Sequence, residues 1–193
     1  MPKGSSGGLR AEVEVGGPFD TQAYLSDGQG VRVGYTLTND GDRPLLVVLE
    51  RGHEEGGLQF GPYVPGAVWV SGGGEGWRGV ARLSKQMFDV PRDSLPIDPW
   101  TAPAQIVPPR ESLSGRIFVR LPIHQRLPRP GSLLSHDEAP LDGRADQVEI
   151  CVQVAPVSEQ FPDTTDMTGI TVGRSLVCAG PLPLSESPDR SST

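Results

Sequence analysis

Two triplets hold the residues whose types could bind a metal ion. Each triplet is a histidine followed by two acidic residues, and the two are His53-Glu54-Glu55 and His136-Asp137-Glu138. Imidazole and carboxylate groups suit Zn²⁺ or Mn²⁺, so loops that brought both triplets together would offer a metal site. Adjacent loop residues do not easily all bind one ion, and acidic loops are usually just solvated. We favour the solvated reading, and keep a metal-dependent enzyme or metal-binding protein as the alternative function.

Other sequence signatures of chemistry are weak. Asp163 and Asp166 could contribute to a Ca²⁺ site, but the twelve-residue spacing of a calcium loop is missing. No Gly-Lys-Ser/Thr follows the run Gly72–Gly74, which predicts a hairpin turn and not a phosphate cradle. No Gly-x-Ser-x-Gly nucleophile motif is present. The sequence therefore predicts a protein that is not an enzyme and that carries no cofactor.

The chain has two cysteines, Cys151 and Cys178. In a reducing compartment such a pair is usually free, whereas in an oxidising one it forms a disulfide. Free structural thiols are the favoured prediction. A disulfide is the alternative, because the two residues would be neighbours if the last two predicted strands paired.

Tryptophan is enriched among the residues that contribute most to binding at protein interfaces. Trp69 and Trp77 flank the glycine turn and are expected in the core. Trp100 lies in a proline-rich stretch, where it is either an anchor for a protein partner or a plug packed on the body of the domain; the plug is the favoured reading.

Charge and composition exclude several classes of partner. The net charge is −7 and the isoelectric point about 4.9, which disfavours nucleic acid and anionic membranes. No apolar run is long enough to span a bilayer, and the N-terminus shows no signal-peptide pattern. A cytoplasmic location is expected, with a removed leader as the alternative.

The clearest structural signal is Gly30–Leu49, which predicts two strands. Residues 31–37 alternate between apolar and polar, as in a half-buried strand. Asn39 to Asp42 then form a turn, in which an Asn or Asp side chain can bond the backbone that follows. Residues 45–49 are apolar on both parities, which predicts a strand covered on both faces.

Further alternating or apolar runs predict an all-β chain. The additional expected strands are 9–15, 58–60, 67–70, 77–83, 113–121, 148–154 and a broken final one over 170–179. Two long loops, Ser84–Pro109 and His124–Ala145, interrupt them. The predicted organisation is a disordered tail over 1–8, one domain over 9–179 and a disordered tail over 180–193. The expected fold is an immunoglobulin-like antiparallel β-sandwich of about eight strands with long Pro/Gly-rich loops.

Two stretches, VRVGYTLTNDGDRPLLVV and PPRESLSGRIFVRLP, resemble bacterial immunoglobulin-like domains, including intracellular proteinase-inhibitor domains. The usual Pro-Gly before the later strand is replaced by Pro109-Arg110, and the inter-sheet Cys-Trp-Cys set is absent. The resemblance implies the sandwich and no functional residue. The favoured function is a non-catalytic module that engages an unidentified protein partner through its long loops or a sheet edge; inhibition of an intracellular protease is a special case.

Overall fold

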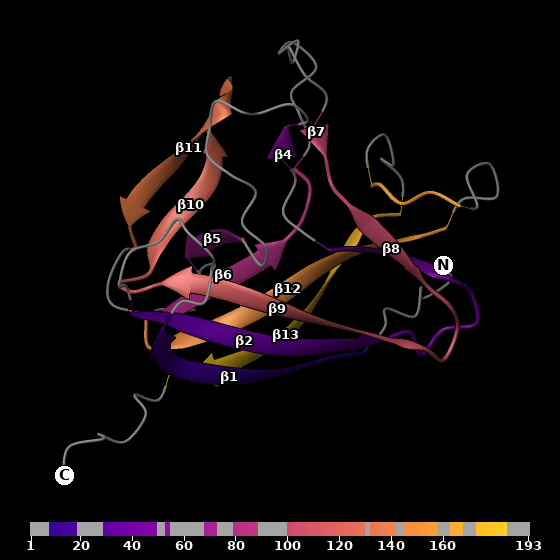
Figure 1. Ribbon diagram of the computed structural model, residues 1–193, viewed down its shortest axis with the longest axis horizontal. Helices are drawn as coiled ribbons and strands as arrows, with labels where there is room; N and C mark the ends of the chain where they lie inside the picture. The colour runs from indigo at the N-terminus through magenta and orange to yellow at the C-terminus, as the bar shows by residue number, and fades with distance from the viewer. Residues whose placement is uncertain are drawn as a thin grey trace.

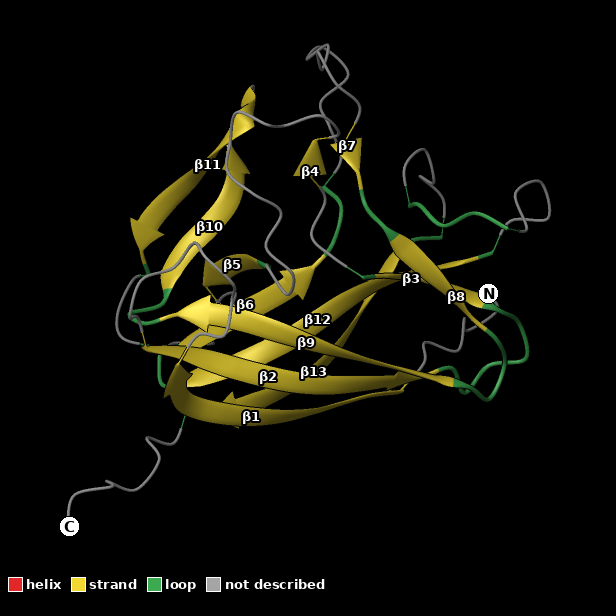
Figure 2. Cartoon of the chain, in the orientation of Figure 1, coloured by secondary structure: helices red, strands yellow, loops and turns green. Residues whose placement is uncertain are grey.

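The structure is a computed structural model and is all-β (Figures 1 and 2). It describes residues 8–18, 29–49, 53–54, 68–72, 79–88, 100–129, 132–141, 145–157, 163–167 and 173–184, and within these ranges every regular element is a strand. No helix in these ranges is long and apolar enough to cross a membrane.

A three-stranded antiparallel sheet forms one layer. Its order is β1 (Gly8–Pro18), β2 (Gln29–Thr38), β9 (Ser112–Arg120). The predicted alternation in β2 is confirmed, because Val31, Val33 and Leu37 are almost fully buried. On the outer face, Thr36 Oγ1 lies 3.0 Å from Ser114 Oγ. A second pair of hydroxyl groups meets across the same two strands, two residues further along each strand. This sheet thus has one apolar and one polar face.

The second layer is a strongly curled eight-stranded sheet (Figure 1). Its order is β11 (Ser132–Pro140), β10 (His124–Arg129), β5 (Trp69–Gly72), β6 (Val80–Lys85), β12 (Gln147–Pro156), β3 (Leu45–Val48), β8 (Ala104–Val107), with β13 (Ser175–Pro183) paired to β12. The β5–β6 hairpin expected across the glycine run is confirmed. A separate pair joins β4 (His53–Glu54) to β7 (Trp100–Thr101).

The main core lies between the two layers. Side chains of β2 and β9 meet those of β6 and β12, including Leu83, Ile117 and Ile150, all fully buried. A second cluster lies beyond β3, where Leu46 and Val48 pack with apolar residues of other segments. Since Val47 belongs to the main core, β3 is covered on both faces, as its sequence predicts.

The predicted all-β class is confirmed, but the immunoglobulin-like antiparallel sandwich of about eight strands is not, because the larger sheet is mixed and curls into a half-barrel. The described ranges contain more than eight strands, and β6 pairs with β12 in parallel, so the sheet is mixed and not purely antiparallel. The loop predicted over 84–109 contains β7 and β8, and the one over 124–145 is largely the β10–β11 hairpin. The last strand continues to Pro183, four residues into the predicted tail. The expected strand over 58–60 lies outside the described residues.

Two turns are joined by the fully buried Asn39. Its Oδ1 accepts a hydrogen bond from Gly41 N–H (3.0 Å), which is the local turn predicted from its sequence. Its Nδ2 donates to the carbonyls of Arg43 (2.8 Å) and Val107 (3.0 Å). One side chain therefore fixes the β2–β3 turn against the end of β8.

The turn that leads into β9 has an unusual residue at its third position. Glu111 N–H donates to the carbonyl of Pro108, and Arg110 has φ of 69°, a left-handed conformation that favours glycine. The guanidinium of Arg110 donates to the carbonyl of Asp40 at 2.8 Å. The arginine thus occupies the conformation of the missing Pro-Gly glycine and adds a contact that glycine could not make.

A tyrosine ring fills the space over Gly115 in the core. A Cβ built on Gly115 would lie 2.3 Å from Tyr35 Cζ, and the ammonium group of the buried Lys85 lies 5.3 Å from the ring centroid. Lys85 Nζ also donates to the carbonyl of Leu49 at 2.6 Å. The absence of a side chain at Gly115 lets the ring of Tyr35 lie across β9. An aromatic ring packed over a glycine in this way stabilises the glycine in a strand.

We expect Gly115→Ala to lower the free energy of unfolding by about 1–3 kcal/mol, since the added methyl group must displace the buried Tyr35 ring. Urea denaturation measures it. Gly34→Ala is the matched control: this exposed glycine of β2 has nothing within 4 Å of the added Cβ, so the change should be neutral or slightly stabilising. Equal effects of the two substitutions would contradict the packing argument.

Candidate functional site

The two histidine triplets lie in different sheets. His53 and Glu54 form β4, whereas His136-Asp137-Glu138 lies in β11, where it pairs with β10. Their described parts are therefore strands and not the loops expected from sequence. Glu55 lies outside the described residues. The metal site built from these triplets remains a prediction.

The structure tests the predictions for the three tryptophans to different extents. Trp69 is buried, as predicted; its indole Nε1 donates to the carbonyl of Gln86 at 3.1 Å, and its ring meets Phe88 edge-on. The backbone of Trp100 pairs with that of Glu54 between β7 and β4. Its role as an anchor remains a prediction, and Trp77 lies outside the described residues.

The aspartate pair considered for calcium includes a structural residue. Asp166 Oδ1 accepts a hydrogen bond from Ala102 N–H at 3.2 Å, and its backbone forms a bridge with Pro103. Asp163 is exposed. The carboxylate of Asp166 therefore helps to hold its segment against the chain just before β8.

A row of polar side chains on β12 is buried away from the main core. Glu149 and Gln153 are each only 7% exposed and Cys151 is fully buried. Gln153 Oε1 accepts a hydrogen bond from Met87 N–H at 3.0 Å. We call Glu149, Cys151 and Gln153 the polar row. These side chains alternate with core residues of β12, so they point to the face of the sheet opposite the main core and are buried there.

Cys151 and Cys178 form a disulfide, so the favoured prediction of free thiols is wrong. The antiparallel pairing of β12 with β13 places the two residues directly opposite each other, with Cα atoms 4.1 Å apart. This is the arrangement that the sequence offered as the alternative. Cys151 is buried whereas Cys178 is exposed, so solvent reaches the bond from the β13 side.

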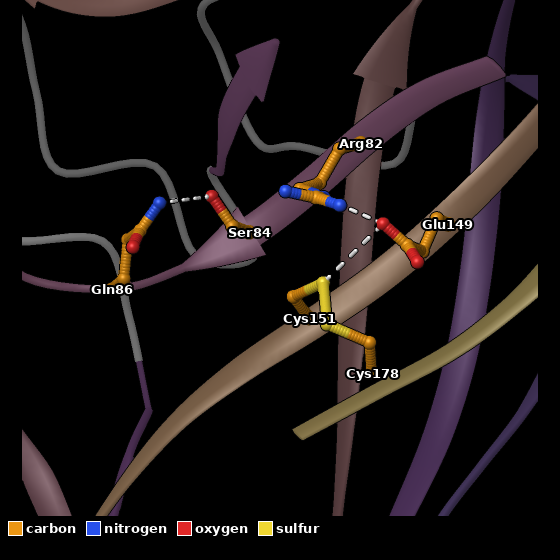
Figure 3. Close-up of a disulfide and its surroundings, with 6 residues drawn as sticks. All are labelled: Arg82, Ser84, Gln86, Glu149, Cys151 and Cys178. Carbon is orange, nitrogen blue, oxygen red and sulfur yellow. Dashed lines mark hydrogen bonds and ion pairs between the residues drawn. A yellow bond between two sulfur atoms is a disulfide. The ribbon is translucent and has the colours of Figure 1, made fainter. Parts of the chain in front are cut away.

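An ion pair lies beside the disulfide (Figure 3). Arg82 Nε is 2.5 Å from Glu149 Oε2, because the parallel register sets these residues opposite each other on β6 and β12. The same oxygen lies 3.8 Å from Cys151 Sγ. A disulfide sulfur has no proton to donate, so this is a packing contact that becomes an S–H···O bond only when the disulfide is reduced.

The carboxylate and the two sulfurs form a compact donor group. Each of Glu149, Cys151 and Cys178 offers one ligand atom, and these atoms lie within 4.8 Å of one another. We call these three residues the Cys-Glu cluster. The sequence shows no spacing motif for it, because Cys178 is 27 residues from Cys151 and meets the other two residues only through the pairing of β12 with β13.

A second candidate site is the outer edge of β9. Within the described residues, β9 pairs only with β2, which leaves one edge of a nine-residue strand without a partner strand. At the other end of this sheet β1 lies alongside β13 (Figure 1). The outer edge of β8 is covered in part, since Ala104 N–H donates to the carbonyl of Thr165.

The hydrogen-bonding pattern shows which β9 groups face this edge. Asn39 N–H donates to the carbonyl of Glu111, so Glu111 and the odd-numbered residues after it face β2. Ser112, Ser114 and Arg116 therefore direct their backbone N–H and C=O groups to the open edge. The hydroxyl contacts of Ser112 and Ser114 with β2 support this assignment. In an antiparallel pair of strands, opposite side chains are closest where the two residues do not exchange backbone hydrogen bonds.

No family model, curated protein or solved structure matches the chain.

Proposed function

We propose that the protein is a non-catalytic binding module, with an immunoglobulin-like sandwich as its scaffold, that pairs an extended segment of a partner protein with the outer edge of β9. The observation that carries the proposal is the unpartnered edge of this long strand within the described part of the chain. An open edge offers a row of backbone donors and acceptors that an added strand can satisfy. Of the long loops, the other route considered from sequence, the one over 124–145 is largely strand, and the described part of the one over 84–109 contains β7 and β8.

The side chains along β9 suggest what kind of segment fits. Arg116 is exposed and Phe118 half-buried, with the guanidinium of Arg32 5.9 Å from the ring centroid. Opposite charges on neighbouring strands attract each other, so an acidic residue beside Arg116 is favoured. An extended segment that places Asp or Glu beside Arg116 matches this edge.

We expect Ser114→Pro to abolish capture of the partner, because proline removes an N–H that faces the open edge while the ladder to β2 is kept. The measurement is an affinity pull-down of the tagged chain from the lysate of the cells that produce it, with quantitative mass spectrometry. Ser114→Ala is the matched control; it also loses the hydroxyl pair with Thr36 but keeps the N–H.

One protein captured by the parent chain and by Ser114→Ala, but not by Ser114→Pro, would support strand addition at β9. Equal capture by all three chains would remove this edge from the proposal. An empty eluate would contradict the binding module. Trp100→Ala in the same pull-down tests whether Trp100 anchors the partner. Unchanged capture would show that Trp100 does not contribute to binding.

A further inference from the structure

We infer that the Cys-Glu cluster is a zinc site that the disulfide closes and that reduction opens. The inference does not depend on strand addition at β9. Reduced Cys151 and Cys178 supply two thiolates, and Glu149 supplies a carboxylate oxygen. Two sulfurs and one carboxylate are ligands that Zn²⁺ accepts, and a water molecule completes four-coordination.

The distances fit this assignment. In a tetrahedral zinc site a thiolate sulfur and a carboxylate oxygen lie about 3.6 Å apart, given bond lengths of roughly 2.3 and 2.1 Å. Cys151 Sγ and Glu149 Oε2 are 3.8 Å apart. The two sulfurs must separate to about 3.8 Å, which rotation about the Cα–Cβ bonds allows once the S–S bond is broken.

Burial and charge make the cluster sensitive to its redox state. Glu149 is nearly buried, and in the disulfide form Arg82 balances its charge. The Arg82 side chain is 36% exposed, so it can turn toward solvent when a cation binds. Cys178 is exposed, which gives a reductant and a metal ion access from the β13 side.

Reduction of the disulfide and binding of the metal are two separate reactions. A dithiol reductant transfers two electrons and two protons to the S–S bond; this bond breaks, two thiols form, and the reductant becomes a disulfide. Zn²⁺ then binds both sulfurs and displaces the two thiol protons to solvent. An oxidant of the disulfide class reverses the first reaction and expels the metal.

The test titrates Co²⁺ and Zn²⁺ into the full chain, oxidised or reduced with a phosphine, which does not compete as a thiol. The reduced chain should bind one ion and show thiolate-to-cobalt charge-transfer absorption, whereas the oxidised chain should not. Cys178→Ser should lose this absorption. Glu149→Gln should weaken zinc binding at least about 10-fold, whereas Glu111→Gln, an exposed carboxylate on the turn before β9, should change nothing.

Circular dichroism of the reduced chain distinguishes a folded site from thiols in an unfolded chain. A folded reduced chain that binds no metal would overturn the inference. So would binding that Glu149→Gln leaves unchanged, whether the reduced chain is folded or not, because the carboxylate would then not be a ligand. Equal binding by oxidised and reduced chains would identify an adventitious ion only.

Discussion

Asn39→Ala is expected to lower the free energy of unfolding by about 3 kcal/mol. The substitution removes three hydrogen bonds of a fully buried side chain, two of them to the carbonyls of Arg43 and Val107. The carbonyl of Val107 loses its amide donor in a buried contact, where water cannot easily replace it, whereas the contact with Arg43 is only partly buried. Urea denaturation followed by circular dichroism measures the loss.

Two variants sharpen this result. Asn39→Asp keeps the acceptor for Gly41 N–H but lacks the Nδ2 donor, and it places a charge in a buried site, so it should destabilise the protein at least as much as alanine does. Asp40→Ala changes the exposed neighbour in the same turn and should stay within about 0.5 kcal/mol of the parent. A loss below 1 kcal/mol for both Asn39 variants would show that the two turns hold their positions without this side chain.

Removal of the disulfide is the second large effect. The double variant Cys151→Ala/Cys178→Ala should lose about 3 kcal/mol, because the bond closes a loop between residues 27 apart in sequence and so restricts the unfolded chain. Urea denaturation should show a lower midpoint. The slope of the free energy of unfolding against urea concentration (the m-value) should also be larger, since an unfolded chain without the cross-link exposes more surface.

The reduced parent chain separates the cross-link from the packing of its sulfurs. It retains both sulfur atoms, so any loss it shares with the double variant belongs to the bond. This comparison is made without added metal and with a chelator, because zinc bound by the reduced cluster would restore stability. A reduced parent as stable as the oxidised one would show that the cross-link contributes nothing.

Local patterns were sufficient to predict some elements. The alternation of β2, β9 and β12 reflects one face on the main core, and the double apolar parity of β3 reflects a strand between two clusters. The turn at Asn39 followed from a side chain that bonds its own backbone. Each of these depends on residues within a few positions of one another.

Other strands were not predicted because they contain or adjoin prolines. Pro128 and Pro140 lie within β10 and β11, and Pro103 and Pro108 flank β8, so these segments were predicted as loops. The register of β10 and β11 shifts at Pro128, which is where a strand tolerates a residue that cannot donate. The Cys-Glu cluster was missed for a different reason: it requires β12 to pair with β13, which the sequence offered only as an alternative because no local pattern encodes the pairing.

The pairing of β2 with β9 also constrains how the chain is made. The residues joined across this ladder, such as Thr36 and Ser114, are 78 positions apart in sequence. At a synthesis rate of about 5–20 residues per second, β9 is synthesised on the order of 4–16 s after the residues of β2 with which it pairs. The β1–β2 hairpin can form during this time, but its apolar face has no layer to cover it. Folding is expected to be slow, with the greatest risk of aggregation during translation, before β9 has extended this sheet and β12 has completed the layer that covers its apolar face.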